Sequence, residues 1–287
     1  MTIAKILVPV RGDGKGPGVL AHAAILAKRF GAHIDLLHCR ARPVDFMPIG
    51  VNLPRALRDQ IRGSAAQLSE EETAALEAEI SGLFPGLGLE RIASDGAQAG
   101  GDPTASWQSA EGKMADVIRS NGRLADIVAV AKPDRDRNLG VNSLRAALFQ
   151  TARPVLLCPP EEPAPDFPDR IAIAWNGALE ATRAVALAQP VLRAAAHVCV
   201  LDGAEPGSPV DGQALVGYLK AHGVEASRTA LSAGDSPGRA ILDAAQESGA
   251  GMLLTGAYGH SHEHETIFGG ATQTIVDRTT MPVMMLH

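Results

Sequence analysis

The sequence predicts an α/β protein made of two tandem domains, each with an open parallel sheet. Short apolar runs alternate with helical patterns along the chain, which is typical of βαβ units with helices on both faces of a sheet. The same succession of runs occurs twice, and a proline-rich segment at 159–168 separates the copies. We therefore expect a first domain with insertions at 1–160 and a second domain at 168–287.

The two copies correspond from their first strand to their last. The corresponding segments are 5–10 and 170–175 (strand), 18–30 and 178–195 (helix), 32–37 and 196–201 (strand), 125–130 and 250–255 (strand), and 153–158 and 281–286 (strand). Runs such as 127–130 and 252–254 are apolar at consecutive positions, as strands covered on both faces are. The proline-rich segment between the copies predicts a stiff, extended linker.

The first copy carries extra residues at about 43–75 and 97–112. Ser69 and Glu72 have the spacing of a capping box, which predicts a helix that begins there and continues to about residue 80. Two interpretations of the extra residues are open: an insertion that covers the edge of the first domain, or a lid over a site.

Composition excludes several classes of function. The net charge is -6 and aromatic residues make up 3% of the chain, so we expect no nucleic-acid partner. No apolar run approaches the roughly 20 residues that span a bilayer, so we expect no membrane partner. Three widely spaced cysteines, Cys39, Cys158 and Cys199, form no disulfide or zinc pattern, and we expect a cytoplasmic protein.

The segment 255–272 is the most informative in the sequence. It follows a predicted strand, contains several glycines, and precedes a predicted helix that begins near Gly270. Glycine allows a ligand to approach the backbone closely, and a helix N-terminus offers free N–H groups to phosphate. The segment therefore predicts a phosphate-binding loop, although glycines that serve turns alone would give the same pattern.

The glycine spacing in this segment, Gly256-x2-Gly259-x9-Gly269, resembles the nucleotide loop of the universal stress protein family. The repeated halves resemble the tandem form of that family, over nearly the whole chain. The resemblance implies a Rossmann-like fold of the adenine nucleotide alpha hydrolase type, and a stress-response protein that binds ATP or another adenine nucleotide. It also implies that the closing strands, 154–158 and 283–286, pair within the chain as an intramolecular pseudo-dimer, with a homodimer as a further option.

The resemblance assigns a site to the second domain. The base would lie near Asn176 and its neighbour Trp175. The candidate ligand-binding residues are Trp175, Asn176, Gly256, Gly259, His260, Gly269, Gly270 and Thr272. The chain departs from the family pattern in two places: Gly270 stands where a Ser or Thr follows the third glycine, with Thr272 as a substitute, and Asn176 stands where Asp is frequent.

The first domain does not repeat the glycine loop. Its corresponding segment, 131–140, has Ala131 and Pro133 where glycines are needed, and Pro133 lacks an N–H donor. The turn at 12–18 fails the P-loop pattern because Gly16 follows Lys15 in place of Ser or Thr. We expect this domain to support the second one, with a remnant pocket near Asp13 as the alternative.

Other interpretations of the second domain remain open. His260, His262 and His264 alternate around Glu263 and could hold a metal, but a polar loop is the simpler interpretation, and we assign no metal site. A weak ATPase or hydrolase would need a base such as Asp235 or His260, and the sequence has no nucleophile elbow. We assign no catalytic residue and predict a regulatory or binding module, with a ligand-free structural protein as the alternative.

Overall fold

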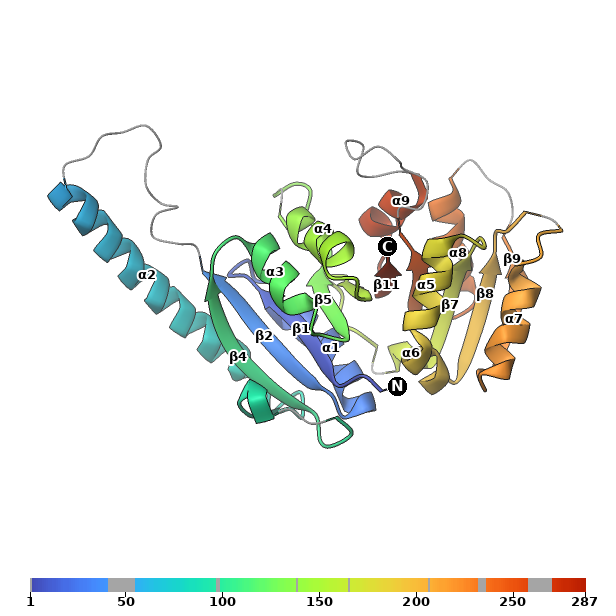
Figure 1. Cartoon of the computed structure of the whole chain (residues 1–287), viewed down its shortest axis with the longest axis horizontal. Coiled ribbons are helices and arrows are strands. Elements are labelled where there is room, and N and C mark those ends of the chain that lie inside the picture. Colours follow the sequence, from blue (N-terminus) through green and yellow to red (C-terminus); the bar gives the residue numbers. More distant parts are fainter. Residues whose placement is uncertain are drawn as a thin grey trace.

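The structure is a computed structural model that describes residues 2–40, 55–96, 99–137, 139–164, 166–205, 207–231, 236–257 and 270–287; the side chains of 55–62, 65 and 66 lie outside this description. The described residues form one sheet of 11 strands with helices on both of its faces (Figure 1). The α/β class that the sequence predicts is confirmed.

The first half of the sheet holds six strands. Its elements are β1 (Lys5–Val10), α1 (Gly16–Phe30), β2 (His33–Arg40), α2 (Arg55–Ser81), β3 (Glu90–Arg91), η2 (Ser94–Gly96), β4 (Thr104–Glu111), α3 (Met114–Gly122), β5 (Ile127–Ala131), α4 (Val141–Gln150) and β6 (Val155–Cys158).

The second half holds five strands. Its elements are η3 (Phe167–Asp169), β7 (Arg170–Trp175), α5 (Leu179–Leu187), α6 (Gln189–Ala194), β8 (His197–Asp202), α7 (Gly212–Ala221), β9 (Ala226–Ala230), α8 (Pro237–Glu247), β10 (Met252–Gly256), α9 (Gly270–Arg278) and β11 (Val283–Leu286).

Each half is a doubly wound parallel sheet. The strand order across the whole sheet is β3-β4-β2-β1-β5-β6-β11-β10-β7-β8-β9. In each half the first strand lies in the middle, and the chain builds outward from it in one direction and then in the other. Such a reversal leaves a crevice beyond the carboxyl ends of the two middle strands, where ligands of doubly wound sheets bind. The two crevices lie beyond β1 and β5, and beyond β7 and β10.

The halves join through their closing strands. β6 pairs with β11 in the antiparallel direction, with Leu157 opposite Val283 and Leu156 opposite Met284. All the other strand pairs in the sheet are parallel. The pairing of the closing strands within one chain, which the resemblance implies, is confirmed, and it leaves neither closing strand with an open edge.

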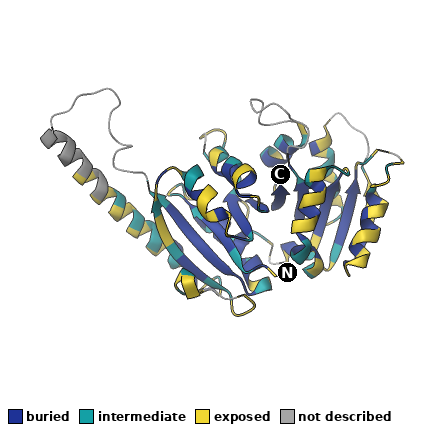
Figure 2. Cartoon of the chain, in the orientation of Figure 1, coloured by how far each residue is buried: buried dark blue, intermediate teal, exposed yellow. Residues whose placement is uncertain are grey.

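Burial explains why the inner strands are apolar without alternation. β5 and β10 are each buried at four consecutive residues, since helices cover both faces of the sheet (Figure 2). One core cluster contains Leu156 and Met284 together with residues of α1, α5 and α7. The other contains Leu157 and Val283 together with residues of α3, α4, α8 and α9. Both cores therefore run across the junction between the halves.

Three predicted elements differ from the structure. The predicted helix at 178–195 is divided into α5 and α6, because Pro190 in the first turn of α6 has no N–H to bond back to α5. The predicted capping box at Ser69 is wrong: α2 already begins at Arg55, and Ser69 lies inside it, where its carbonyl accepts from Thr73 Oγ1 at 2.6 Å. Most of the predicted insertion at 97–112 is β4, the counterpart of β9.

Candidate functional site

The crevice of the second half lies between the carboxyl ends of β7 and β10. These strands are parallel neighbours, with Ala174 opposite Thr255, so Trp175 and Gly256 follow side by side at the edge of the sheet. From there the chain leaves β7 toward α5 and leaves β10 toward α9. Three candidate residues, Trp175, Asn176 and Gly256, are thus brought together by the topology.

Asn176 begins the turn that connects β7 to α5. Its side chain is exposed, and Oδ1 accepts a hydrogen bond from the Ala178 N–H at 3.1 Å. Gly177 has a φ of 73°, and a Cβ there would be 2.8 Å from Val210 Cγ2. This Asx turn therefore fixes the Asn176 side chain at the mouth of the crevice before any ligand binds.

Trp175 is fixed by contacts within the second half. The residue is buried, and its indole Nε1 donates to the Val210 carbonyl at 2.8 Å. Its own carbonyl accepts from the Gly203 N–H at 2.8 Å. The indole donor is therefore already used by the protein, and Trp175 holds the loop around Val210 against β7.

Gly256 is packed against a helix. A Cβ built on it would be 2.5 Å from the Ala181 nitrogen and 2.9 Å from Glu180 Cβ, both in the first turn of α5. The following residue, Ala257, is buried, and its N–H donates to the Leu286 carbonyl at 2.8 Å. The start of the glycine segment is therefore held between α5 and β11.

The segment ends at the N-terminus of α9. Gly270 is its exposed first residue and has a φ of 28°, and Thr272 is buried. A Cβ on Gly238, in α8, would be 2.5 Å from the Ala271 carbonyl oxygen, so α8 and α9 pack closely at their first turns. The remaining candidates, Gly259, His260 and Gly269, lie outside the described residues, as do His262, His264 and Asp235.

Asp202 is a buried acid at the carboxyl end of β8 that the sequence analysis did not select. Its Oδ2 accepts from Arg228 Nε at 2.7 Å, and its Oδ1 accepts from the Ala204 N–H at 3.1 Å. Burial alone would raise the pKa of Asp202, but Arg228 and the N–H groups of Ala204 and Gly212 outweigh it and hold the pKa below its usual value. The signal was present in the sequence, as an acid directly after the apolar run 198–201.

In the first half, Lys15 bonds across the corresponding crevice to the residues that follow β5. Lys15 Nζ donates to the Lys132 carbonyl at 3.1 Å and lies 3.7 Å from Asp134 Oδ2. Lys132 Nζ in turn donates to the Thr279 carbonyl at the end of α9, at 2.8 Å. The segment that replaces the glycine loop in this half thus bonds to Lys15 across its own crevice and to the end of α9 in the other half.

Within the described ranges, no group of three or more His, Cys, Asp or Glu side chains is placed to hold a metal ion. Among the helices of the same ranges, none combines the length and the apolar character needed to cross a bilayer.

Comparisons with known proteins agree with this architecture. Residues 169–287 match the model of the universal stress protein family. No curated protein matches the chain in sequence. A universal stress protein from Archaeoglobus fulgidus is similar in structure, with a TM-score of 0.67 and 16% identity over 98% of this chain and 95% of its own. A functionally unknown protein from Pseudomonas aeruginosa PAO1 is similar with a TM-score of 0.53 and 16% identity over 99% of this chain and 92% of its own.

The family model covers the half that contains the glycine segment, and the two similar structures cover both halves. At 16% identity the likeness to those structures concerns the fold alone. The chain thus has the tandem fold of a two-domain universal stress protein, and its C-terminal half, residues 169–287, belongs to the universal stress protein family.

Proposed function

We propose that the C-terminal half binds an adenine nucleotide, ATP or another, in the crevice between β7 and β10, and that the chain acts as a regulatory or binding module in a stress response. The observation that carries the proposal is the strand–glycine segment–helix unit at this crevice. β10 ends at Gly256 and α9 begins at Gly270, and the glycine spacing Gly256-x2-Gly259-x9-Gly269 lies between them.

In this proposal the base and the phosphates of the nucleotide lie at opposite ends of the crevice. The base lies beside Asn176, whose amide can both donate and accept hydrogen bonds. The phosphates lie at the glycine segment and at the first N–H groups of α9, where the positive end of the helix dipole favours negative charge. His260 and Thr272 are the polar side chains we assign to the phosphates.

The first half binds no nucleotide in this proposal. Lys15 bonds across the equivalent crevice to the Lys132 carbonyl and pairs with Asp134, and the segment 131–140 lacks the glycine pattern. The proposal therefore predicts one nucleotide for each chain. The domain limits 1–160 and 168–287 remain part of the proposal.

Calorimetric titration of the whole chain with ATP and with AMP tests this assignment. We expect one site per chain, and we expect Asn176→Ala to weaken binding about 3–10-fold, since a lost hydrogen bond is worth about 0.5–1.5 kcal/mol. Asp13→Ala removes the equivalent turn bond in the first half, where Asp13 Oδ1 accepts from the Lys15 N–H at 3.1 Å, and as the matched control it should leave both the affinity and the stoichiometry unchanged. No heat of binding with either nucleotide, and no nucleotide released when the purified protein is denatured, would favour a ligand-free structural protein instead.

A further inference from the structure

Helix α9 is held at its carboxyl end by two cations of the first half. Lys132, the residue after β5, donates from Nζ to the Thr279 carbonyl at 2.8 Å, directly after the last residue of the helix. Arg135 Nε lies 2.9 Å from Asp277 Oδ1, in the last turn. The first half therefore contacts the helix to which the proposed function assigns the phosphates.

These contacts stabilise the last turn of α9 from outside the helix. The carboxyl end of a helix carries partial negative charge and free carbonyl groups, so a carboxylate there is unfavourable and a cation is favourable. Asp277 is such a carboxylate, and within α9 its Oδ1 accepts only from the uncharged Gln273 Nε2, at 2.6 Å. Lys132 and Arg135 supply the positive charge that this end of the helix favours.

The backbone of the first half fixes the places of both cations. The Lys132 N–H donates to the Cys158 carbonyl at 2.7 Å, which continues the pairing of β5 with β6. Arg135 follows Asp134, whose N–H and carbonyl are both bonded to Leu139 at 2.9 Å, so the loop that carries Arg135 is closed. The positions of Lys132 and Arg135 are thus set within the first half and not by α9.

The residue of the second half that corresponds to Lys132 is Ala257. The Ala257 N–H donates to the Leu286 carbonyl at 2.8 Å, just as the Lys132 N–H donates to the Cys158 carbonyl at the end of the equivalent strand pair. Ala257 is buried and its methyl group has no donor, so it cannot hold the end of α4 as Lys132 holds the end of α9. Support from this position therefore runs one way, from the first half to the second.

Helix α9 connects these contacts to the crevice of the second half. It has nine residues and is about 13 Å long, and its backbone hydrogen bonds join the last turn to the first. Ile275 and Val276 are buried between the two ends, in the core cluster that α8 shares. A change in the position of Asp277 is therefore transmitted along the helix to the N–H groups near Gly270.

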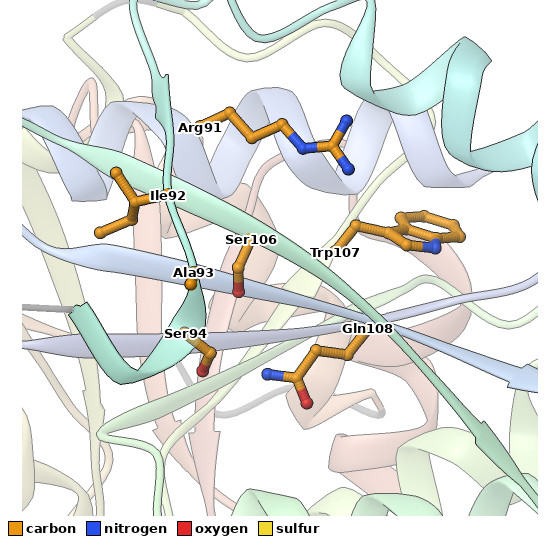
Figure 3. A pocket seen from close by; sticks show the side chains of 7 residues that line it. All are labelled: Arg91, Ile92, Ala93, Ser94, Ser106, Trp107 and Gln108. Atoms are coloured by element: carbon orange, nitrogen blue, oxygen red, sulfur yellow. The ribbon is translucent and has the colours of Figure 1, made fainter.

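The groove beside β4 has no comparable link to a site. It has a volume of about 550 Å³ and lies between β4 and the segment that follows β3 (Figure 3). The hydroxyls of Ser94 and Ser106 in its lining donate to the buried Asp35 Oδ1 at 2.7 and 2.8 Å. Arg91, also in the lining, forms an ion pair with Glu77. These three side chains are bonded within the protein itself, and we assign the groove no ligand.

We propose that Lys132 and Arg135 are positioning residues for the nucleotide phosphates: they hold the last turn of α9 and thereby fix its first turn at the crevice. The inference rests on the proposed function, and it gives the first half a part in setting the affinity of the second. The Arg135 side chain is largely exposed, and an exposed ion pair alone contributes little, so the two cations are best tested together.

Calorimetric titration of the whole chain with ATP, and with adenosine as a ligand without phosphates, tests the inference. We expect Lys132→Met combined with Arg135→Met to weaken ATP binding about 2–30-fold, the range for residues that act on a site from outside it. The same variant should bind adenosine as the wild type does, because α9 faces the phosphates and not the base. Arg135→Lys keeps the charge and should keep the wild-type affinity for ATP.

The matched control is Lys113→Met combined with Arg137→Met. It also removes one lysine and one arginine from the first half, at exposed positions where neither side chain bonds to a partner among the described residues. ATP binding should stay unchanged in this control, and circular dichroism melting checks that both double variants are folded.

The possible failures are distinguishable. Unchanged ATP affinity in the Lys132 and Arg135 double variant would overturn the inference and leave the proposed function intact. An equal loss in the control would assign the effect to charge alone, and an equal loss of adenosine binding would assign it to the whole crevice; either result contradicts the inference. A wild type that binds neither ATP nor adenosine would overturn the proposed function, and the inference with it.

Discussion

Gly256, the last residue of β10, lies against the first turn of α5, so that a Cβ built on it would be 2.5 Å from the Ala181 amide nitrogen. Side chains do not approach backbone atoms so closely, and neither the strand nor the helix backbone can move without disturbing the core. The first glycine of the nucleotide-type spacing is therefore required by packing inside the second half, whatever its contact with a ligand.

This contact predicts a loss of stability for Gly256→Ala. Forcing one extra methyl group into a packed site costs about 1–3 kcal/mol, so the free energy of unfolding should fall by that amount in the absence of nucleotide. Urea unfolding measures the change. Gly217→Ala is the control, because a Cβ there meets nothing within 4 Å, and it should leave stability unchanged or raise it by up to about 1 kcal/mol. Equal unfolding free energies for the wild type and Gly256→Ala would show that the glycine is not needed for packing.

The buried strands were predictable from the sequence, because a strand that is buried on both faces is a run of consecutive apolar residues. The four buried residues of β5 are all apolar, and so are those of β10 apart from Thr255, and the repeat of the pattern shows that the two strands are equivalent. The sequence does not identify β4 as a strand, because β4 lies near the edge of the sheet. Its sequence, TASWQSAE, is exposed at three of eight positions, so it lacks the apolar run that identifies an inner strand.

The candidate site was predictable in position but not in contacts. The topology brings Asn176 and Gly256 to one crevice, as the repeat and the glycine spacing predict. The sequence could not show that Trp175 donates to Val210, or that α5 presses on Gly256, because these contacts join segments that are distant along the chain. Lys15 illustrates the same limit, since its partners Lys132 and Asp134 are more than a hundred residues away in the sequence.

A buried carboxylate in the first half offers a second test of stability. Asp35 Oδ1 accepts hydrogen bonds from Ser94 and Ser106 and lies 3.1 Å from His33 Nε2, while Oδ2 forms an ion pair with Lys5. Burial alone would raise the pKa of Asp35, but His33, Lys5 and the two serine hydroxyls together hold it well below its usual range. The carboxylate is therefore charged in the folded protein at any pH where the protein is handled.

Asp35→Asn should lower the free energy of unfolding by about 2–3 kcal/mol near neutral pH. Breaking a fully buried ion pair costs about 3–5 kcal/mol, and the partial exposure of Lys5 reduces that figure. Because the folded pKa is lowered, the contribution is complete above the unfolded value near 4 and is lost as the pH falls below it. The difference in the free energy of unfolding between the wild type and Asp35→Asn, measured by urea unfolding, should thus become smaller only in acid. Asp95 is exposed, so Asp95→Asn is the control and should have the same free energy of unfolding as the wild type. An equally unchanged value for Asp35→Asn would show that the network does not stabilise the fold.

His22 makes the contact between the halves sensitive to acid. It is fully buried in α1, and its ring lies 5.9 Å from that of Phe167, the first residue of η3. Nδ1 lies 2.8 Å from the Gly18 carbonyl and must carry the proton, whereas Nε2 has no hydrogen-bond partner among the residues that the structure describes. Burial lowers the pKa of His22 and outweighs both the Gly18 carbonyl and the charge of Glu161, which raise it. A second proton would place an unpaired charge at this junction.

The sign of the pH dependence follows from that lowered pKa. The pKa of histidine in the unfolded chain is about 6.5, and above that pH the neutral His22 costs the fold nothing. As the pH drops from there toward the lower pKa of His22 in the folded protein, the free energy of unfolding falls by up to about 1.4 kcal/mol per pH unit. Urea unfolding between about pH 5 and 8 should show this slope, and His22→Leu should reduce it. Part of the slope should remain in that variant, because burial and Arg40 also lower the pKa of His38. The exposed His222→Leu should keep the wild-type slope, and an unchanged slope in His22→Leu would assign the acid sensitivity to another group.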